Sequence, residues 1–266
     1  MSTDLSKASR AAEQAAYAAG THLRASRSRL AEVVITHQAP GDVVSAIDRE
    51  ALTLIREVVM RAFPEHGFIG ENSGAEAGVL LTDPRPHWVV DPLDGTANYL
   101  RGYPQFAVSI ALVEAGEPLI GVIYDPIRNE FFGAIRGRGA VLNGQAIRCS
   151  PPHTAIEALA ATVFPKPTSP RMPRYMTEFG RVLRGFGGVR RSGSMALELA
   201  YLAAGRIDAF WSHDMGPWDT AAGVVLLRES GALVQARDGR PLLASGSLLG
   251  CTPPLYEAFL SLLVEA

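Results

Sequence analysis

Residues 88–98 read Trp88-Val89-Val90-Asp91-Pro92-Leu93-Asp94-Gly95-Thr96-Ala97-Asn98. A short apolar strand, His87–Val90, is expected to stop at Asp91-Pro92, and two carboxylates three residues apart follow from it. Two neighbouring carboxylates repel each other unless a cation neutralises them, and hard oxygen ligands suit magnesium. Gly95 and Thr96 can begin a helical turn whose free N–H groups face an anion. The segment therefore predicts metal ions beside a phosphate site, with an ordinary strand-ending turn as the alternative.

Two further acidic residues stand where other elements would end or begin. Glu71 follows the short apolar run Phe68-Ile69, where a second strand would end, and Asp219 follows Trp218 at the start of a helical pattern. Taken singly, Glu71 is equally compatible with a solvated loop, and Asp219 with a first-turn partner of the helix dipole. Together with the two aspartates of the first segment, they form a candidate set of oxygen ligands for a divalent cation.

Helices are predicted before this segment and an antiparallel meander after it. An alanine-rich helix is expected over residues 3–30, capped by Ser2, Thr3 or Asp4, and a second one over 45–62, with Asp48 in its first turn. The Asn143-Gly144 pair predicts a tight hairpin turn within the meander. The expected strands are Phe106–Val113, Leu119–Tyr124, Phe131–Ile135 and Ala146–Arg148.

The rest of the chain alternates helices with strands. An antiparallel layer followed by an alternating one predicts a mixed α/β fold of stacked helices and sheets. The Pro/Ser-rich stretch at 150–153 and the loop at 165–173 divide it into an N-terminal half, 1–150, and a C-terminal half, 151–266, which together make one catalytic unit. The expected helices are 172–185, 194–204, 217–230 and 253–265, and the expected strands are 188–191, 207–211 and 232–236.

The composition is that of an ordinary soluble globular protein. Of 266 residues, 47% are hydrophobic and 20% charged, and the net charge of −2 gives no global field that attracts nucleic acid or an anionic membrane. The N-terminus lacks the uninterrupted apolar run of a signal peptide, and no stretch approaches the roughly 20 apolar residues that cross a bilayer. The two cysteines, Cys149 and Cys251, form no CxxC pair; one disulfide is the alternative, but the pattern is more typical of a reduced, cytoplasmic chain.

The arginines gather in one stretch of the chain, whereas the histidines are scattered. The arginines between 171 and 191 are interpreted as a solvated helix face or a subunit contact, because no aromatic-rich motif accompanies them; a polyanion site is the alternative. The six histidines are scattered without metal-ligand spacing, and His87 and His213 are expected to be surface or loop residues. The arginines concerned are Arg171, Arg174, Arg181, Arg184, Arg190 and Arg191.

In their order along the chain, these segments resemble the inositol monophosphatase family. The resemblance implies a layered αβαβα sandwich, commonly homodimeric. It also implies a phosphoric monoester hydrolase that is magnesium-dependent and lithium-sensitive, and that acts through an activated water with no covalent intermediate. The resemblance spans nearly the whole chain, through Gly41–Asp48, Gly70-Glu71, Trp88–Asn98, Ser192–Ala196, Ala204–Asp208 and Pro217–Gly223.

The resemblance also assigns roles to residues. Two to three Mg²⁺ ions per site are implied: Glu71, Asp91 and the Leu93 carbonyl would hold the first. Asp91, Asp94 and Asp219 would hold the second, and Glu71 would help to hold a weaker third. Glu71, with Thr96 tied to Asp48, would activate the water. The implied substrate contacts are Asp94, Gly95, Thr96, Gly193, Ser194, Met195 and Asp219.

Two positions depart from the family pattern. Asn72 stands where the family usually has a second acid, which puts the third metal in doubt. Ser212, seven residues before Asp219, stands where inositol-specific members carry a glutamate that contacts a sugar hydroxyl. The substrate therefore stays open among inositol phosphates, histidinol phosphate, a sugar bisphosphate and a 3′-phosphonucleotide.

Other classes fit the chain less well. A haloacid-dehalogenase phosphatase would need its two aspartates two residues apart, and no G-x-S-x-G elbow, P-loop or H-E-x-x-H helix is present. A catalytically idle binding protein on the same scaffold is the minor alternative. All four candidate metal carboxylates are retained, which favours the enzyme.

Overall fold

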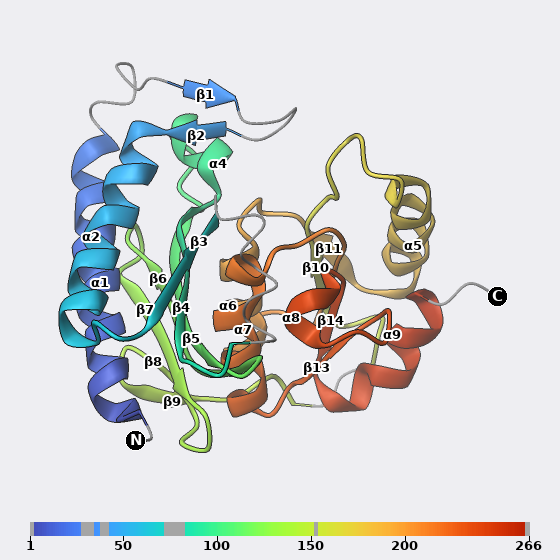
Figure 1. The fold of residues 1–266 in the computed structure, drawn as a ribbon. Coiled ribbons are helices and arrows are strands. Elements are labelled where there is room, and N and C mark those ends of the chain that lie inside the picture. Colours follow the sequence, from blue (N-terminus) through green and yellow to red (C-terminus); the bar gives the residue numbers. More distant parts are fainter. Residues whose placement is uncertain (1–2, 28–34, 38–42, 72–82, 152–153, 264–266) are drawn as a thin grey trace.

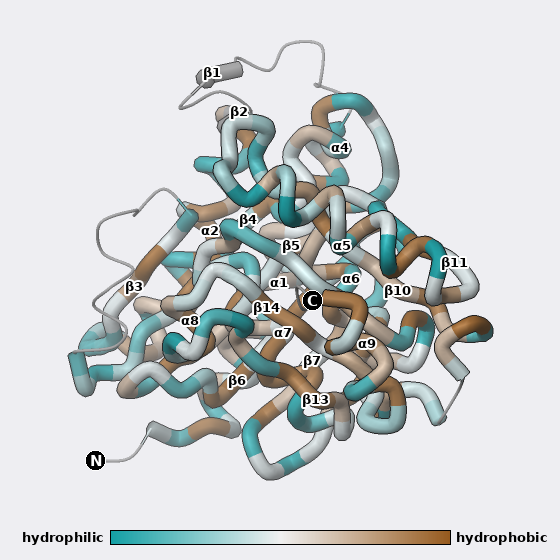
Figure 2. The backbone as a smooth tube through the Cα atoms, turned by 90° about the vertical axis from the view of Figure 1, so that its right-hand side faces the viewer, coloured by the Kyte–Doolittle hydropathy of each residue, from teal (hydrophilic) through white to brown (hydrophobic). Residues whose placement is uncertain are grey.

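Helices and sheets alternate in layers in the computed structural model, which describes residues 3–27, 35–37, 43–71, 83–151 and 154–263. Helices α1 (Leu5–Ser26) and α2 (Ala46–Ala62) cover a seven-stranded sheet, and α6 (Met195–Ala203) and α7 (Pro217–Ser230) separate it from a five-stranded one (Figure 1). Helices α5 (Met172–Gly185) and α9 (Tyr256–Leu263) form the last layer, which faces the viewer in Figure 2. A hydrophobic core fills each of the spaces between these layers. The predicted αβαβα arrangement is confirmed.

The first sheet carries the predicted meander. Strands β3 and β4 are parallel, and each later neighbour pairs antiparallel. Asn143 and Gly144 both have positive φ, 48° and 78°, as the hairpin signal requires. In sheet order the strands are β3 (Gly67–Gly70), β4 (His87–Asp94), β5 (Ala107–Glu114), β6 (Glu117–Asp125), β7 (Glu130–Ile135), β8 (Ala140–Leu142) and β9 (Gln145–Ile147).

The second sheet contains strands that the sequence analysis missed. Its order is β11-β10-β12-β14-β13, with β10 parallel to both neighbours and β14 antiparallel to both of its own. Strands β10 (Leu159–Thr162) and β14 (Leu248–Cys251) were not predicted, because four-residue apolar runs carry no strand periodicity. The remaining strands are β11 (Gly188–Arg190), β12 (Ala209–Ser212) and β13 (Leu233–Ala236).

The shorter elements lie at the edges of these layers. The predicted N-terminal cap is confirmed, since the Asp4 carboxylate accepts the N–H groups of Ser6 and Lys7 at the start of α1. The predicted end of that helix, residues 28–30, and the predicted C-terminal residues 264–265 lie outside the described part. The other elements are β1 (Ile35–His37), β2 (Val43–Ser45), α4 (Thr96–Leu100), α8 (Leu242–Ser245) and the 3₁₀ turn Pro253–Leu255.

Helix α7 packs closely because it carries a run of three small residues near its middle. A Cβ on Gly121 of β6 would lie 2.2 Å from the Ala222 carbonyl, and one on Gly223 would lie 2.6 Å from the Leu199 Cβ on α6. The sequence Ala221-Ala222-Gly223 therefore lets α7 approach both the first sheet and α6. One core cluster includes residues of both sheets and both central helices, so the two halves share their interior.

Two further observations concern hydropathy and cysteine. Among the described residues, no helix is both long enough and apolar enough to span a bilayer. Cys149 and Cys251 are free thiols, and Cys251 is buried.

Candidate active site

A bulge in β4 presents two of the predicted metal ligands. The strand does not stop at Asp91-Pro92 as predicted but continues to Asp94, pairing Asp91 with Ser109 and Asp94 with Ala107 across a register shift. Pro92 lacks an N–H, and the bulge takes it out of the ladder, so the strand continues past it. The Leu93 N–H donates to Asp91 Oδ1 at 3.0 Å, which fixes the first carboxylate.

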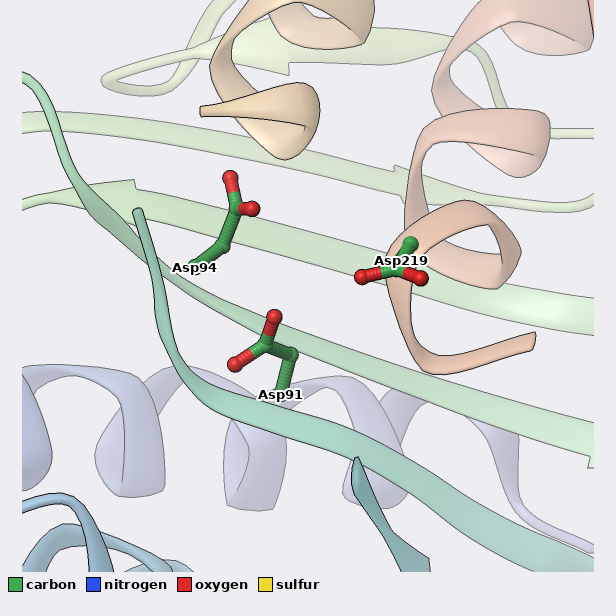
Figure 3. A group of neighbouring side chains, drawn as sticks. All are labelled: Asp91, Asp94 and Asp219. Carbon is green, nitrogen blue, oxygen red and sulfur yellow. The ribbon is translucent and has the colours of Figure 1, made fainter. Parts of the chain in front are cut away.

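Three carboxylates converge at this bulge. Asp91, Asp94 and Asp219 offer oxygens that all lie within 4.8 Å of one another. In Figure 3 the first two reach from β4, and the third reaches from the first turn of α7 into the same space. Burial raises the pKa of Asp91 well above its usual range, and the neighbouring charges of Glu71, Asp94 and Asp219 raise it further. Glu71 therefore belongs to the same electrostatic cluster.

The central helices hold two of these carboxylates by their N-termini. Asp94 Oδ2 accepts the Ser194 hydroxyl at 2.5 Å and the Ala196 N–H at 2.8 Å, at the start of α6. Asp219 Oδ2 accepts the Gly216 N–H at 2.7 Å, which caps α7. Burial raises the pKa of Asp94 in spite of these hydrogen bonds. The groups that begin each helix thus orient the site.

The donor set fits a hard divalent cation. Asp91 and Asp94 are buried, and neither forms an ion pair with any described lysine, arginine or histidine. Buried carboxylates in mutual contact are costly unless a positive charge compensates them, and oxygen ligands of this kind suit Mg²⁺. The residues present would hold the metal through Asp91, Asp94 and Asp219, with Glu71 and the Leu93 carbonyl beside them.

Gly95 makes the turn that follows the carboxylates. It has φ +92°, and a Cβ there would lie 2.9 Å from the Gln105 carbonyl oxygen and 3.3 Å from that of Gly193. Only glycine fits this position without strain. Helix α4 begins at Thr96, so the predicted helical turn is confirmed.

The Thr96 hydroxyl donates to the Leu93 carbonyl at 2.9 Å. Asp48, on α2, is buried, and that burial raises its pKa to about 6 while Arg49 opposes the shift. Asp48 contributes to the charge felt by Asp91, so it lies near the cluster. Its hydrogen bond to Thr96 stays a prediction.

Asn98 is a site residue to which the sequence analysis gave no role. Its side-chain N–H groups donate to the Gln105 carbonyl at 2.7 Å and the Ser192 carbonyl at 2.9 Å. The Ser192 N–H donates to the buried Glu198 at 2.9 Å. The sequence offered one signal for this network: Glu198 is a glutamate inside the otherwise apolar Met195–Ala203 helix, and such a buried charge needs partners. Together these bonds fix the 192–194 loop against the turn at Gly95.

The predicted substrate residues of this loop lie against the carboxylates. Ser194 and Met195 are buried, and the Ser194 hydroxyl donates to Asp94. Gly193 has φ +89°, and a Cβ there would lie 2.8 Å from the Asn98 side-chain nitrogen. Their contacts with a substrate stay predictions. Asn72 lies outside the described residues.

Ser212 and His213 are buried, and Asp214 is half-buried. Ser212 is fully buried, and its hydroxyl makes no hydrogen bond to a described residue. His213 contacts Glu178 at 2.8 Å and Ser247 at 3.0 Å, and Asp214 pairs with Arg171 at 3.0 Å. The two residues that follow Ser212 therefore already have other partners.

The expectation that His87 and His213 are surface or loop residues is wrong for His87 and right for His213 only in that it lies in the bend after β12, where it is nevertheless buried. His87 is 3% exposed within β4 and bonds to the Arg85 carbonyl, and His213 is 2% exposed beside Glu178. The burial of His213 could not be predicted from the local sequence, because the carboxylate that it contacts, Glu178, comes from α5. Two arginines of the 171–191 stretch form ion pairs within the chain: Arg171 pairs with Asp214, and Arg174 pairs with Glu178, each at 3.0 Å.

Comparison with known proteins identifies the family. A model of the inositol monophosphatase family matches residues 4–266. An inositol-1-monophosphatase of Rhizobium meliloti (strain 1021) is 39% identical over 237 residues, which are 89% of this chain and 88% of that protein. The Nus factor SuhB of Escherichia coli (strain K12) is 38% identical over 230 residues, 86% of this chain and 85% of that one. The crystal structure of the extragenic suppressor protein suhB from Bartonella henselae has a TM-score of 0.89 at 34% identity, covering 97% of this chain and 98% of that one. The chain belongs to the inositol monophosphatase family.

Proposed function

We propose that this member of the family hydrolyses small phosphate monoesters with the help of Mg²⁺. Its class, phosphoric monoester hydrolase, follows from the family. The observation that carries the metal requirement is the cluster of Asp91, Asp94 and Asp219, whose oxygens lie within 4.8 Å of one another and of which two residues are buried.

Mg²⁺, when bound, supplies Lewis-acid stabilisation of phosphate oxygens and makes water easier to deprotonate. The chain's own part is to hold oxygen ligands in place before a substrate arrives. Asp94 is fixed by α6 and Asp219 by the cap of α7, so neither carboxylate has to reorganise. Such preorganisation matters, because phosphate monoesters are among the slowest of biological substrates to hydrolyse unaided.

Phosphate binding is assigned to Gly95 and Thr96. The first N–H groups of α4 have no partner within the helix, and Gly95 keeps side-chain atoms away from them. We propose that Glu71 accepts a proton from the attacking water. In the same step the Thr96 hydroxyl would turn from Leu93 toward Asp48 and help to orient that water.

We propose that the enzyme discriminates poorly among small phosphate monoesters, inositol 1-phosphate included, or prefers one other than inositol 1-phosphate. Ser212 is neutral and buried, so it does not reproduce the carboxylate contact of inositol-specific relatives. Histidinol phosphate, sugar bisphosphates and 3′-phosphonucleotides are the other candidates. We also propose that the protein is a homodimer, which sedimentation tests, and that it is cytoplasmic, which cell fractionation tests. A division of the chain near residue 150 is proposed as well, and limited proteolysis tests it.

A non-catalytic role is the alternative, and relatives named Nus factor SuhB raise it. The retained carboxylates favour the enzyme. Release of phosphate from glycerol 2-phosphate, measured with Mg²⁺ and with a chelator, separates the two. The variant Asp91→Asn removes one carboxylate of the cluster and should abolish this release. Its matched control is Asp238→Asn, because Asp238 is a surface aspartate that pairs with Arg240. The absence of magnesium-dependent release from every ester would contradict the proposed function.

A further inference from the structure

A cavity of about 660 Å³ lies on the α1 side of the first sheet, where that helix passes β7 and β8 (Figure 1). Ser9, Glu13 and Tyr17 line it from α1, at spacings of four residues that put them on one face of the helix. Strand β7 lines the opposite side, with Phe131 and Gly133 among its residues. Strands β5 and β6 separate β7 from β4, so this cavity is apart from the carboxylate cluster. Its volume is in the range of small-molecule sites.

Two aromatic rings form one wall of the cavity. The Tyr17 and Phe131 rings are stacked, with centroids 5.4 Å apart and planes 22° apart, and Tyr124 packs edge-on against Tyr17 at 4.8 Å. Tyr17 keeps 37% of its surface exposed. A Cβ on Gly133 would lie 2.9 Å from the Phe131 ring, so a larger residue there would displace that ring. The wall is therefore flat and apolar, and part of it is open to a ligand.

Two asparagines at the edge of the cavity hold this wall in place. Asn143 Oδ1 accepts the Phe131 N–H at 2.8 Å, and Asn143 Nδ2 donates to the Asn129 carbonyl at 3.1 Å. Asn129 Oδ1 accepts the Tyr124 hydroxyl at 2.8 Å. The rings are thus positioned before any ligand arrives, which lowers the entropic cost of binding.

Glu13 brings an unpaired carboxylate to this wall. It is half-buried, and it makes neither an ion pair nor a hydrogen bond with any residue that the structure describes. Burial raises the pKa of Tyr17, and the charge of Glu13 raises it further, which places the carboxylate close to that ring. Other glutamates around the sheet already have partners: Glu130 pairs with Arg206, and Glu229 accepts two backbone N–H groups of the turn after β7. A half-buried carboxylate without a partner favours a positively charged ligand.

The one arginine that lines the cavity is bonded elsewhere. Arg138 Nη1 donates to the Ser6 hydroxyl at 2.6 Å. Ser6 stands about two helical turns, or roughly 10 Å, before Glu13 on α1. Arg138 therefore leaves the Glu13 carboxylate unpaired beside the two rings.

We propose that this cavity binds a small organic cation in which an ammonium or guanidinium group is joined to a flat apolar part. The cationic group would contact Glu13, and the apolar part would lie against the Tyr17 and Phe131 rings. A carboxylate beside a stacked aromatic pair discriminates against anions and gives neutral molecules only half of the available contacts. The site is additional to the proposed phosphatase site, so the cation should bind whether or not a substrate is present.

Phenethylamine is a suitable probe, and 2-phenylethanol and ethylamine each keep one half of it. The whole protein is titrated at saturating Mg²⁺, which keeps the cation from the carboxylate cluster, and binding is followed by the NMR shifts of backbone amides. We expect phenethylamine to shift the amides of Gly133 and Gly139, which line the cavity, with a Kd of about 1 mM. Each half-probe should bind at least about tenfold more weakly.

Three variants test the residues. Glu13→Gln should weaken phenethylamine by about three- to tenfold, because a half-exposed charge is partly screened, and should leave 2-phenylethanol unchanged. Glu57→Gln is the matched control, since Glu57 is exposed on α2 and does not line the cavity; it should change neither Kd. Tyr17→Leu should weaken both probes that contain a ring, whereas Tyr17→Phe, which keeps the ring, should not.

Each outcome decides the proposal. A loss in Glu13→Gln that is confined to the cationic probe supports it. Equal affinities for phenethylamine and 2-phenylethanol, equal effects of Glu13→Gln and Glu57→Gln, or shifts confined to amides near Asp91 and Asp219 would overturn it. The absence of binding at about 10 mM would overturn it as well. Phosphate release with Mg²⁺ bears only on the proposed function, so the two proposals can fail separately.

Discussion

Replacing Asp91 by asparagine separates the function of the site from the stability of the fold. Asparagine keeps the shape of the side chain and can still accept the Leu93 N–H, so the bulge in β4 should persist. The change removes one negative charge from a cluster that contains Asp94 and Asp219. With Mg²⁺ present, we expect kcat to fall by at least about a hundredfold, since a single preorganised electrostatic group contributes that much.

The same change should stabilise the metal-free protein. Two unit charges 4.8 Å apart repel by about 3.5 kcal/mol at an effective dielectric constant of about 20. Protonation relieves part of this repulsion, so we expect the free energy of unfolding to rise by about 1–3 kcal/mol and Tm by at least about 2 °C. Because the pKa of Asp91 is raised in the fold, the wild type loses stability as pH rises above 3.8 toward that folded pKa. The advantage of the variant should therefore appear at neutral pH and vanish below pH 3.8.

Two measurements on the same preparations check both halves of this prediction. Phosphate release at saturating Mg²⁺ gives kcat, and thermal unfolding in a chelator, at acidic and neutral pH, gives the change in Tm. Asp238→Asn is the control with the opposite sign: its carboxylate pairs with Arg240, so neutralising it should leave Tm unchanged or slightly lower. A metal-free Asp91→Asn protein that is less stable than wild type at neutral pH would refute the repulsion argument. Near-normal turnover would refute the role of Asp91 in metal binding.

Four further outcomes are expected. Burial would raise the pKa of Glu178, but hydrogen bonds from His213 and Arg237 outweigh it and hold that pKa at about 2, below the usual 4.5. Glu178→Gln should therefore cost about 1–3 kcal/mol of unfolding free energy above pH 4.5, a difference that urea titrations should show disappearing as pH falls toward 2. Asp48→Asn should lower kcat and leave KM nearly unchanged in steady-state kinetics; a rise in KM alone would contradict its proposed role in orienting water. Lithium should inhibit nearly uncompetitively, and no inhibition at concentrations comparable to Mg²⁺ would count against the family's metal chemistry here. Since Ser212 is neutral and buried, kcat/KM for inositol 1-phosphate should not exceed that of every other ester by a hundredfold; a larger preference would point to another residue in place of the missing glutamate.

The elements with strong local signals were predictable from the sequence. The helix from Pro217 to Ser230 begins at a proline and ends before Gly231, whose φ of +88° closes it, and the predicted bounds were right. The hairpin at Asn143-Gly144 was equally clear. Strands β10 and β14 were missed, since a four-residue buried strand gains its pairing only when the sheet assembles. The continuation of β4 was missed because Pro92 has the same appearance in a turn as in a bulge.

The candidate site divides in the same way. The clustering of Asp91, Asp94 and Asp219 was predicted from short motifs, and the structure brings those carboxylates together. The groups that orient them were less visible, because their partners are far away in the chain. Asn98 reaches a carbonyl 94 positions away, and the hydroxyl that donates to Asp94 comes from a residue 100 positions away. Local sequence motifs therefore predicted the candidate ligands, but not the hydrogen-bond partners that orient their side chains.

The Ser194 hydroxyl donates to Asp94, and the Asn98 amide donates to the Ser192 carbonyl; these two bonds tie the turn proposed to bind metal to the C-terminal half of the chain. Neither the first 150 residues nor the remainder contains a complete set of ligands, because Asp219 belongs to the second group and Asp91 and Asp94 to the first. Turnover can therefore be measured as a sign that the two halves are associated. If the backbone were cut in the connection between Ile147 and Leu159, turnover should survive as long as the fragments stay associated. If Mg²⁺ were held by Asp91 and Asp94 of one fragment and Asp219 of the other, adding it should raise the affinity of the fragments for each other.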